Sequence, residues 1–249
     1  MKIYFAPMEG LTSYIYRRAH HRYYGGIDKY YTPFIAPGRK CKLANREMRE
    51  IDPKNNEGVP TVPQILGNQA AIVIEMTKRL YEMGYEEINL NLGCPSGTVV
   101  SRGRGSGLLA DSQGLEEFLA AIYQAYPGGS HCPKLSIKSR LGISEPQEFE
   151  QILEIYNQFP VHELTLHPRV QKDFYKKPVR AESFAYAAEH AKAPLCYNGN
   201  LNSKQDFDKL IVTYPDLQAV MIGRERFRIR ILPMNSCAQR SHCRQKDLT

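Results

Sequence analysis

Residues 87–126 read EINLNLGCPSGTVVSRGRGSGLLADSQGLEEFLAAIYQAY, and this stretch holds the unit on which the chain is built. It opens with a β-rich run at 87–92, continues through a glycine-rich loop, and ends in a segment at 112–126 with helical periodicity. A strand followed by a loop and a helix is the repeating unit of proteins with parallel sheets. The stretch therefore predicts an α/β fold.

Strand-like and helix-like segments alternate along the rest of the chain. The β-rich runs lie at 2–6, 29–35, 61–66, 87–92, 134–138, 163–167, 194–198 and 218–223. The helical segments lie at 13–24, 70–83, 112–126, 146–159, 181–190 and 203–214, and a long polar loop spans 37–60. Eight strand units in about 250 residues predict a TIM (β/α)8 barrel. An open, doubly wound sheet shows the same alternation, and the number of units favours the barrel.

The eighth unit departs from this pattern. After Ile222-Gly223-Arg224, the helix that should complete the barrel is replaced by ERFRIRILPMNSCAQRSHCRQKDLT, with alternating arginines, a proline and little helical amphipathicity. We therefore predict a barrel domain at 1–224 and an atypical basic tail at 225–249, disordered or irregularly packed, where the eighth helix should be.

Composition excludes several classes of protein. The chain has 249 residues, of which 42% are hydrophobic, and no apolar run reaches the roughly 18 residues of a membrane helix. Pro7 and Glu9 stand where a signal peptide has its apolar region. Six cysteines without a CxxC pair argue against a disulfide framework and against a metal site, and favour a cytoplasmic protein. The net charge is +7, but six basic and two acidic residues from position 225 onward supply +4 of it, so charge alone is weak support for a nucleic-acid partner.

Polar side chains follow seven of the eight predicted strands, at the edge where barrels of this kind have their active sites. They are Glu9, Gln64, Asn68, Asn91, Lys138, Arg140, His167, Arg169, Asn198, Asn200 and Arg224. Basic residues of the loops surround this edge: Arg39, Lys40, Lys42, Arg102, Arg104, Lys172, Lys176, Lys177 and Arg180. The aromatic residues Tyr30, Tyr31, Phe174 and Tyr175 lie near them in the sequence. The pattern suits a folded polyanion over the barrel mouth, although each charge alone is also explained as solvated surface.

The last two strand ends have the features of a phosphate site. Asn198-Gly199-Asn200 and Gly223-Arg224 place glycines where backbone N–H groups can approach an anion, and Arg224 adds charge. An Asn-Gly pair is equally explained as a turn. The lysine and histidine at the ends of the fifth and sixth strands favour a phosphorylated cofactor.

Cys94 is the most informative single residue. A lone cysteine is most often a small buried apolar residue, but Cys94 lies beyond a strand end in a loop with five glycines. With an ordinary pKa of about 8.5 it would be mostly thiol at neutral pH and could donate a proton.

Taken together, these pieces resemble the tRNA-dihydrouridine synthases, a family of flavin-dependent reductases on a TIM barrel. The matching pieces are APMEGLTS at 6–13, QILGN at 64–68, INLNLGCPSGTVVSRGRGSGLL at 88–109, KSRLG at 138–142, LTLHPR at 164–169, NGN at 198–200 and IGR at 222–224. The GCP block with its glycine-rich continuation is the most specific of them. The resemblance covers about residues 1–224.

The resemblance implies an enzyme that uses FMN, with NADPH as reductant, to reduce the C5–C6 double bond of specific uridines in tRNA to dihydrouridine. It implies that FMN lies across the barrel mouth and is held by Pro7, Met8, Gln64, Lys138, His167, Asn198, Gly199, Asn200, Gly223 and Arg224. It also implies that Asn91 and Arg169 contact the substrate and that Cys94 is the general acid. The target uridine has to be extruded from the folded tRNA to reach the site.

Three departures from the family pattern leave alternatives open. Glu225 follows Arg224, Val170 stands where many members have a threonine, and we expect the family's C-terminal helical domain to be missing. A frameshift or a premature end after Arg224 is one hypothesis for the tail. An FMN barrel acting on a small molecule, such as a dihydroorotate dehydrogenase or an ene-reductase, and an inactive truncated member of the family are the other interpretations. The oligomeric state, the tRNA position that is modified and the choice between NADPH and NADH stay open.

Overall fold

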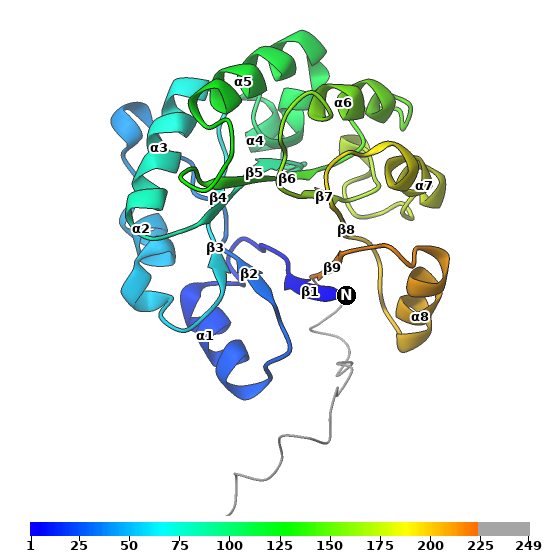
Figure 1. The fold of residues 1–249 in the computed structure, drawn as a ribbon, viewed down its shortest axis with the longest axis horizontal. Coiled ribbons are helices and arrows are strands. Elements are labelled where there is room, and N and C mark those ends of the chain that lie inside the picture. The colour runs from blue at the N-terminus through cyan, green and yellow to red at the C-terminus, as the bar shows by residue number, and fades with distance from the viewer. Residues whose placement is uncertain (224–249) are drawn as a thin grey trace, which may run out of the picture.

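The computed structural model describes residues 1–223, which form a ring of parallel strands with helices on its outside (Figure 1). The strands are β1 (Lys2–Phe5), β2 (Lys29–Tyr31), β3 (Thr61–Val62), β4 (Gln64–Ile65), β5 (Glu87–Leu92), β6 (Lys134–Ser139), β7 (Leu164–Leu166), β8 (Leu195–Tyr197) and β9 (Ala219–Ile222). The α-helices are α1 (Tyr14–Tyr23), α2 (Asn45–Ile51), α3 (Ala70–Glu82), α4 (Gly97–Val100), α5 (Ser112–Ala125), α6 (Glu148–Tyr156), α7 (Ala181–His190) and α8 (Lys204–Thr213). Short 3₁₀ turns are η1 (Arg39–Cys41), η2 (Pro53–Asn55), η3 (Gly105–Ala110) and η4 (Gln171–Asp173).

The strands are hydrogen-bonded in the order β3-β2-β1-β9-β8-β7-β6-β5-β4, and the ring closes through Pro63, which separates β3 from β4. Proline has no N–H to donate to a ladder, so one predicted strand is recorded as two. The carbonyl of Pro63 still accepts from Asn89 N at 2.9 Å, and Ile65 forms a parallel bridge with Ile35. The (β/α)8 barrel prediction is thus confirmed, and the open doubly wound sheet is rejected.

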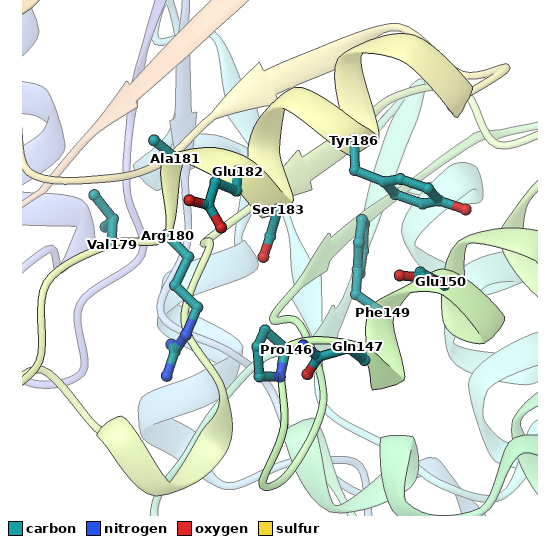
Figure 2. A pocket seen from close by; sticks show the side chains of 10 residues that line it. All are labelled: Pro146, Gln147, Phe149, Glu150, Val179, Arg180, Ala181, Glu182, Ser183 and Tyr186. Atoms are coloured by element: carbon teal, nitrogen blue, oxygen red, sulfur yellow. The ribbon is translucent and has the colours of Figure 1, made fainter.

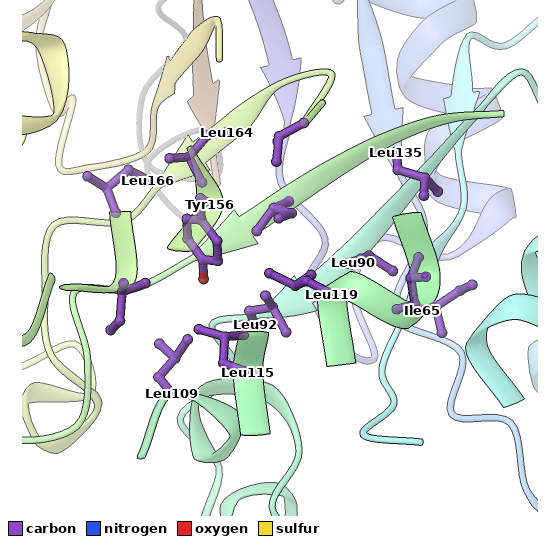
Figure 3. Packing of buried hydrophobic residues seen from close by; sticks show 14 of the residues in the cluster. Ile65, Leu90, Leu92, Leu109, Leu115, Leu119, Leu135, Tyr156, Leu164 and Leu166 are labelled. Carbon is purple, nitrogen blue, oxygen red and sulfur yellow. The ribbon is translucent and has the colours of Figure 1, made fainter. Parts of the chain in front are cut away.

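Side chains of successive strand residues point to opposite faces of the barrel wall. Leu90 and Leu92 of β5 lie outside the ring and pack in one apolar cluster with Leu115 and Leu119 of α5 (Figure 3). Each such fully buried side chain contributes about 1.5–3 kcal/mol. The alternate residues of the strands point into the barrel, where an apolar cluster lies: Tyr4, Ala6, Tyr31, Val62, Cys196, Ala219 and Met221.

The predicted long polar loop at 37–60 is wrong in part, because it contains α2 and two 3₁₀ turns. α2 has only seven residues, so it shows no full apolar stripe to a pattern search. Polar contacts hold it instead: Glu47 accepts from the N–H of Ala44, and the buried Glu50 pairs with the buried guanidinium of Arg17 at 2.9 Å.

The last described strand, β9, pairs with β1, so the eighth strand is in place. Arg224 and the predicted tail at 225–249 lie outside the described residues. Within residues 1–223, no helix is long and apolar enough to cross a membrane.

Candidate active site

Most of the residues predicted for the site gather in one pocket of about 90 Å³ at the C-terminal ends of the strands. Nine of its eleven lining residues come from the predicted set: Pro7, Met8, Lys138, His167, Arg169, Asn198, Gly199, Asn200 and Gly223. Ala6 and Tyr175 complete the lining. None of the eleven is an aspartate or a glutamate, so the pocket combines cations and amides without a carboxylate.

A larger pocket of about 620 Å³ lies between α6 and α7 (Figure 2). Its lining includes Glu150, Glu182 and Arg180 but none of the predicted site residues. We assign the active site to the smaller pocket, because the chemistry converges there.

Lys138 provides a partly buried positive charge. Its Nζ donates to Asn198 Oδ1 at 2.7 Å, and Asn198 in turn donates to the carbonyl of Met221 at 2.8 Å. Burial, with the positive charge of Arg140 as a second cause, lowers the pKa of Lys138 from 10.5 to about 8. No carboxylate within residues 1–223 pairs with this ammonium group. Such a site is set up to receive an anion.

Arg169, with His167 as its hydrogen-bond partner, provides the second positive charge of the pocket. Arg169 Nη1 lies 2.6 Å from His167 Nε2, and Arg169 Nη2 donates to Asn200 Oδ1 at 3.2 Å. Because a guanidinium can only donate, His167 Nε2 has to accept, and the imidazole proton is assigned to Nδ1. Arg169 Nε also donates to the carbonyl of Lys177 at 2.6 Å, which fixes the guanidinium over the pocket.

Gly199 is required by its surroundings. A Cβ at this position would lie 2.3 Å from the Oη of Tyr197, so a larger residue would displace either the loop or the ring. The backbone after β8 can therefore approach a ligand closely at Gly199, and Gly223, the last described residue, lines the same pocket. Together with Lys138 and Arg169, these glycines fit a phosphorylated ligand.

The loop after β5 is folded around Cys94. Asn91 Oδ1 accepts from the N–H groups of Gly93 and Cys94 at 3.1 and 2.9 Å. Ser106 binds the Cys94 carbonyl through both its N–H and its hydroxyl, at 3.1 and 2.9 Å. Gly105 has a φ of +57°, and a Cβ there would lie 2.9 Å from the Cβ of Cys94, so only glycine allows this close wrap.

The environment of Cys94 keeps its sulfur protonated. Burial raises the pKa of the thiol, and the Ser96 backbone and the positive charge of Arg140 only partly oppose this effect. Cys94 does not itself line the pocket, but Asn91 in its strand is paired in register with Lys138. A neutral thiol beside a cationic pocket can deliver a proton.

Known proteins match this chain over most of its length. The family model for dihydrouridine synthase matches residues 4–241. The chain belongs to the dihydrouridine synthase family. A probable tRNA-dihydrouridine synthase of Helicobacter pylori strain J99 is 28% identical, over 91% of this chain and 67% of its own length. The tRNA-dihydrouridine(16) synthase of Pseudomonas putida is 30% identical, over 90% of this chain and 69% of its own length.

Solved structures confirm the fold of this dihydrouridine synthase family member. Morphinone reductase in complex with tetrahydroNAD has a TM-score of 0.60 at 10% identity, over 91% of this chain and 86% of its own. The old yellow enzyme from Trypanosoma cruzi has a TM-score of 0.61 at 7% identity, over 89% of this chain and 84% of its own. At these identities the likeness concerns the barrel alone.

The family match runs to residue 241, past Arg224, the last residue of the motifs that carry the resemblance. The proposed frameshift at that point stays a hypothesis, since the residues concerned lie outside the described part of the chain.

Gln64 lies deeper in this dihydrouridine synthase barrel than the other predicted residues. Its side chain is fully buried, with Nε2 donating to Asn89 Oδ1 and Oε1 accepting from Asn91 Nδ2, both at 2.8 Å. It does not line the pocket, so its direct contact with a cofactor stays a prediction.

The sequence places Arg140 among the polar residues at the strand ends but assigns it no role, whereas in the structure this residue joins two loops of the site. It donates to the carbonyls of Gly93 at 3.0 Å, Val170 at 2.9 Å and Phe174 at 2.7 Å, and lies over the ring of Tyr175. It thereby ties the Cys94 loop to the loop after β7. Its position at the strand end was visible in KSRLG, but its role was not, because its carbonyl partners come from distant loops that no sequence pattern brings together.

Proposed function

We propose that this chain reduces the C5–C6 double bond of uridine in tRNA, with FMN as its bound flavin and NADPH as reductant. The observation that carries the proposal is the pairing of a protonated Cys94, held by Asn91, with a carboxylate-free cationic pocket in a member of this family. Relatives named tRNA-dihydrouridine synthases support the choice of substrate.

The pocket residues fit FMN. Lys138 and Arg169 offer charge to a phosphate, the backbone at Gly199 can approach it closely and Gly223 lines the same pocket, while Pro7 and Met8 supply apolar surface. When bound and reduced by NADPH, the flavin would supply the hydride that uracil C6 accepts. The Lys138 ammonium stabilises negative charge that develops beside it, because burial makes its interaction with an anion stronger than in water.

Cys94 completes the reaction from the protein side. Hydride addition at C6 leaves negative charge at C5 and its conjugated carbonyl, and the Cys94 Sγ–H bond supplies the proton for C5. The reduced base then carries one new hydrogen on each carbon, and the thiolate is reprotonated from solvent. A general acid at this position contributes about 10²–10⁴-fold in rate.

The surface around the pocket supports a large polyanionic substrate. The loop after β7 exposes three lysines and two aromatic residues: Lys172, Lys176, Lys177, Phe174 and Tyr175. Lysines bind phosphates, and aromatic rings stack on bases at about 1–3 kcal/mol per base. A small substrate leaves these groups without a role, which weighs against the small-molecule alternative.

The test begins with the visible flavin absorption of the 249-residue protein after incubation with FMN and gel filtration. Retained flavin is followed by an assay of NADPH oxidation and of dihydrouridine formed in tRNA. We expect Cys94→Ala to retain flavin but to lose about 10²–10⁴-fold in dihydrouridine formation. Cys132→Ala is the matched control and should behave like the wild type, because Cys132 lies before β6, at the opposite end of that strand from Lys138. A protein that folds but retains no flavin, or a fully active Cys94→Ala variant, would reject the proposal.

A further inference from the structure

A chain of buried side-chain hydrogen bonds runs through the barrel from the start of β5 to its end. Ser136 Oγ donates to Glu87 Oε1 at 2.8 Å, and Asn89 Nδ2 donates to Ser136 Oγ at 2.9 Å. Gln64 Nε2 then donates to Asn89 Oδ1, and Asn91 Nδ2 donates to Gln64 Oε1, each at 2.8 Å. All five residues are at most 9% exposed, so water cannot replace these partners.

The lower end of the chain has a fixed direction. Glu87 Oε2 forms an ion pair with Lys29 Nζ at 2.7 Å, so the carboxylate can only accept. Ser136 therefore has to donate its single hydrogen to Glu87, and its oxygen has to accept from Asn89. That choice fixes the amide orientation of Asn89, and through it the orientation of Gln64.

The upper end demands the same direction independently. The N–H groups of Gly93 and Cys94 can only donate, so Asn91 has to present its Oδ1 to them and its Nδ2 to Gln64. The carboxylate at one end and the backbone N–H groups at the other are thus both satisfied by one orientation of all three amides. Reversing the chain would turn the Asn91 NH₂ toward two backbone N–H groups, which leaves buried donors unpaired.

We propose that Glu87 is a positioning residue for Cys94: it sets the orientation of the Asn91 amide, and so the conformation of the Cys94 loop, from the opposite end of the barrel. The proposal rests on the role of Cys94 as proton donor. Glu87 itself touches neither pocket nor loop, and acts only through Ser136, Asn89 and Gln64.

Glu87→Gln creates a conflict that cannot be resolved at both ends. If the new amide turns its oxygen to Ser136, its NH₂ faces the ammonium of Lys29. If the new amide turns its NH₂ to Ser136, the whole chain reverses and the conflict moves to the backbone of Cys94. Removing the ammonium in Lys29→Met/Glu87→Gln relieves the first arrangement and restores the native direction. Glu163 then loses its 3.6 Å ion pair with Lys29 but keeps the hydrogen bonds that Tyr4 and Tyr31 donate to it.

Two readouts test the proposal on the flavin-loaded protein. The first is kcat and KM for dihydrouridine formation in tRNA. The second is the rate at which iodoacetamide alkylates Cys94, followed by mass spectrometry of its peptide from pH 7 to pH 10. In Glu87→Gln we expect kcat to fall about 10–100-fold with little change in KM. We expect Cys94 to be alkylated about fivefold faster at pH 8, because a released loop exposes the thiol.

Matched variants separate positioning from general loosening. Ser136→Ala cuts the chain at one hydroxyl and should reproduce both effects even where Glu87→Gln folds poorly. Lys29→Met/Glu87→Gln should return kcat to within about threefold of the wild type. Tyr4→Phe removes a 2.6 Å hydrogen bond to the neighbouring buried Glu163, off the chain, and should leave both readouts unchanged.

Wild-type values of kcat and alkylation rate in Glu87→Gln or Ser136→Ala would overturn the proposal, as would equal effects in Tyr4→Phe. A wild-type protein that forms no dihydrouridine would reject the proposed function, whereas the alkylation profiles would still test the coupling of Glu87 to Cys94.

Discussion

Replacing Lys138 by methionine should make the flavin-free protein more stable and the flavin-bound protein less so. Lys138 holds a charge in a pocket that provides Asn198 as a neutral partner and no carboxylate. Burial therefore costs free energy as long as no anion is bound. A bound phosphorylated flavin would reverse this balance, because its negative charge would compensate the ammonium.

The magnitude follows from the lowered pKa of Lys138. A folded-state pKa of about 8, against 10.5 in the unfolded chain, corresponds to about 3 kcal/mol of destabilisation at pH 7. Lys138→Met also loses the hydrogen bond to Asn198, which costs about 1 kcal/mol of stability. The free energy of unfolding of the variant should therefore exceed that of the wild type by about 2 kcal/mol at pH 7. The unfolded chain binds the extra proton between about pH 8 and 10.5, so wild-type stability rises with pH in that window and the advantage of the variant falls to nearly zero by about pH 9.5.

Thermal unfolding at pH 7 and pH 9.5, with and without FMN, measures the stability difference between the variant and the wild type, its pH dependence and its reversal by FMN. The variant should melt about 6 °C higher than the wild type at pH 7 without FMN. FMN at about a hundredfold excess over its Kd should stabilise the wild type by about 2.7 kcal/mol and the variant much less. Lys134→Met, at the exposed start of the same strand, is the control and should change neither value. A variant that melts lower at pH 7, or that keeps the full FMN-induced shift, would refute the reasoning.

Three further outcomes follow from the same geometry. Gly199→Ala should weaken FMN binding about tenfold in a fluorescence titration, because its Cβ would meet Tyr197 Oη at 2.3 Å. An unchanged Kd would contradict the close approach of the FMN phosphate to the backbone at Gly199. Phe174 has a φ of +48°, so Phe174→Gly should raise the free energy of unfolding in urea by about 1 kcal/mol. The same variant should have a higher KM for tRNA, because it removes an exposed ring that can stack on a base. The raised pKa of Cys94 predicts that iodoacetamide alkylates its thiol only above the pH range in which an ordinary cysteine ionises, and rapid alkylation already complete at pH 7 would show that Cys94 is not a protonated acid.

The fold was predictable from the sequence because it depends on a local signal repeated eight times. Every predicted strand is found, with boundaries within a few residues. The exceptions have local causes that a periodicity search misses. Pro63 splits one strand in the ladder without opening the ring, and α2 is held by the pair of Glu50 and Arg17 rather than by an apolar stripe.

The pocket was predictable for a related reason, since all parallel strands of a barrel end at one rim. Residues such as Lys138 and Asn198, sixty positions apart, could be placed together from the topology alone. The support around them could not be predicted in this way. Arg140 acts through backbone carbonyls, and Gln64 through other amides, so their partners depend on the packed structure and not on residue type.

The pocket at the barrel mouth and the interior at the opposite end differ in charge, and this arrangement links stability to function. The mouth collects Lys138, Arg140 and Arg169, and burial lowers the pKa of the first two. The buried carboxylates of Glu87 and Glu163 lie at the opposite end, where Lys29 pairs with both. A barrel folded for stability alone would place these opposite charges together. Keeping them apart destabilises the empty protein but leaves the mouth with a positive field for an anionic cofactor and substrate, which is the trade expected at a functional site. The chain of hydrogen bonds from Glu87 to Asn91 connects these two regions. Glu87 is held in place by its ion pair with Lys29, so it can fix the orientation of the amides that position the Cys94 loop, where no such ion pair exists within the described residues.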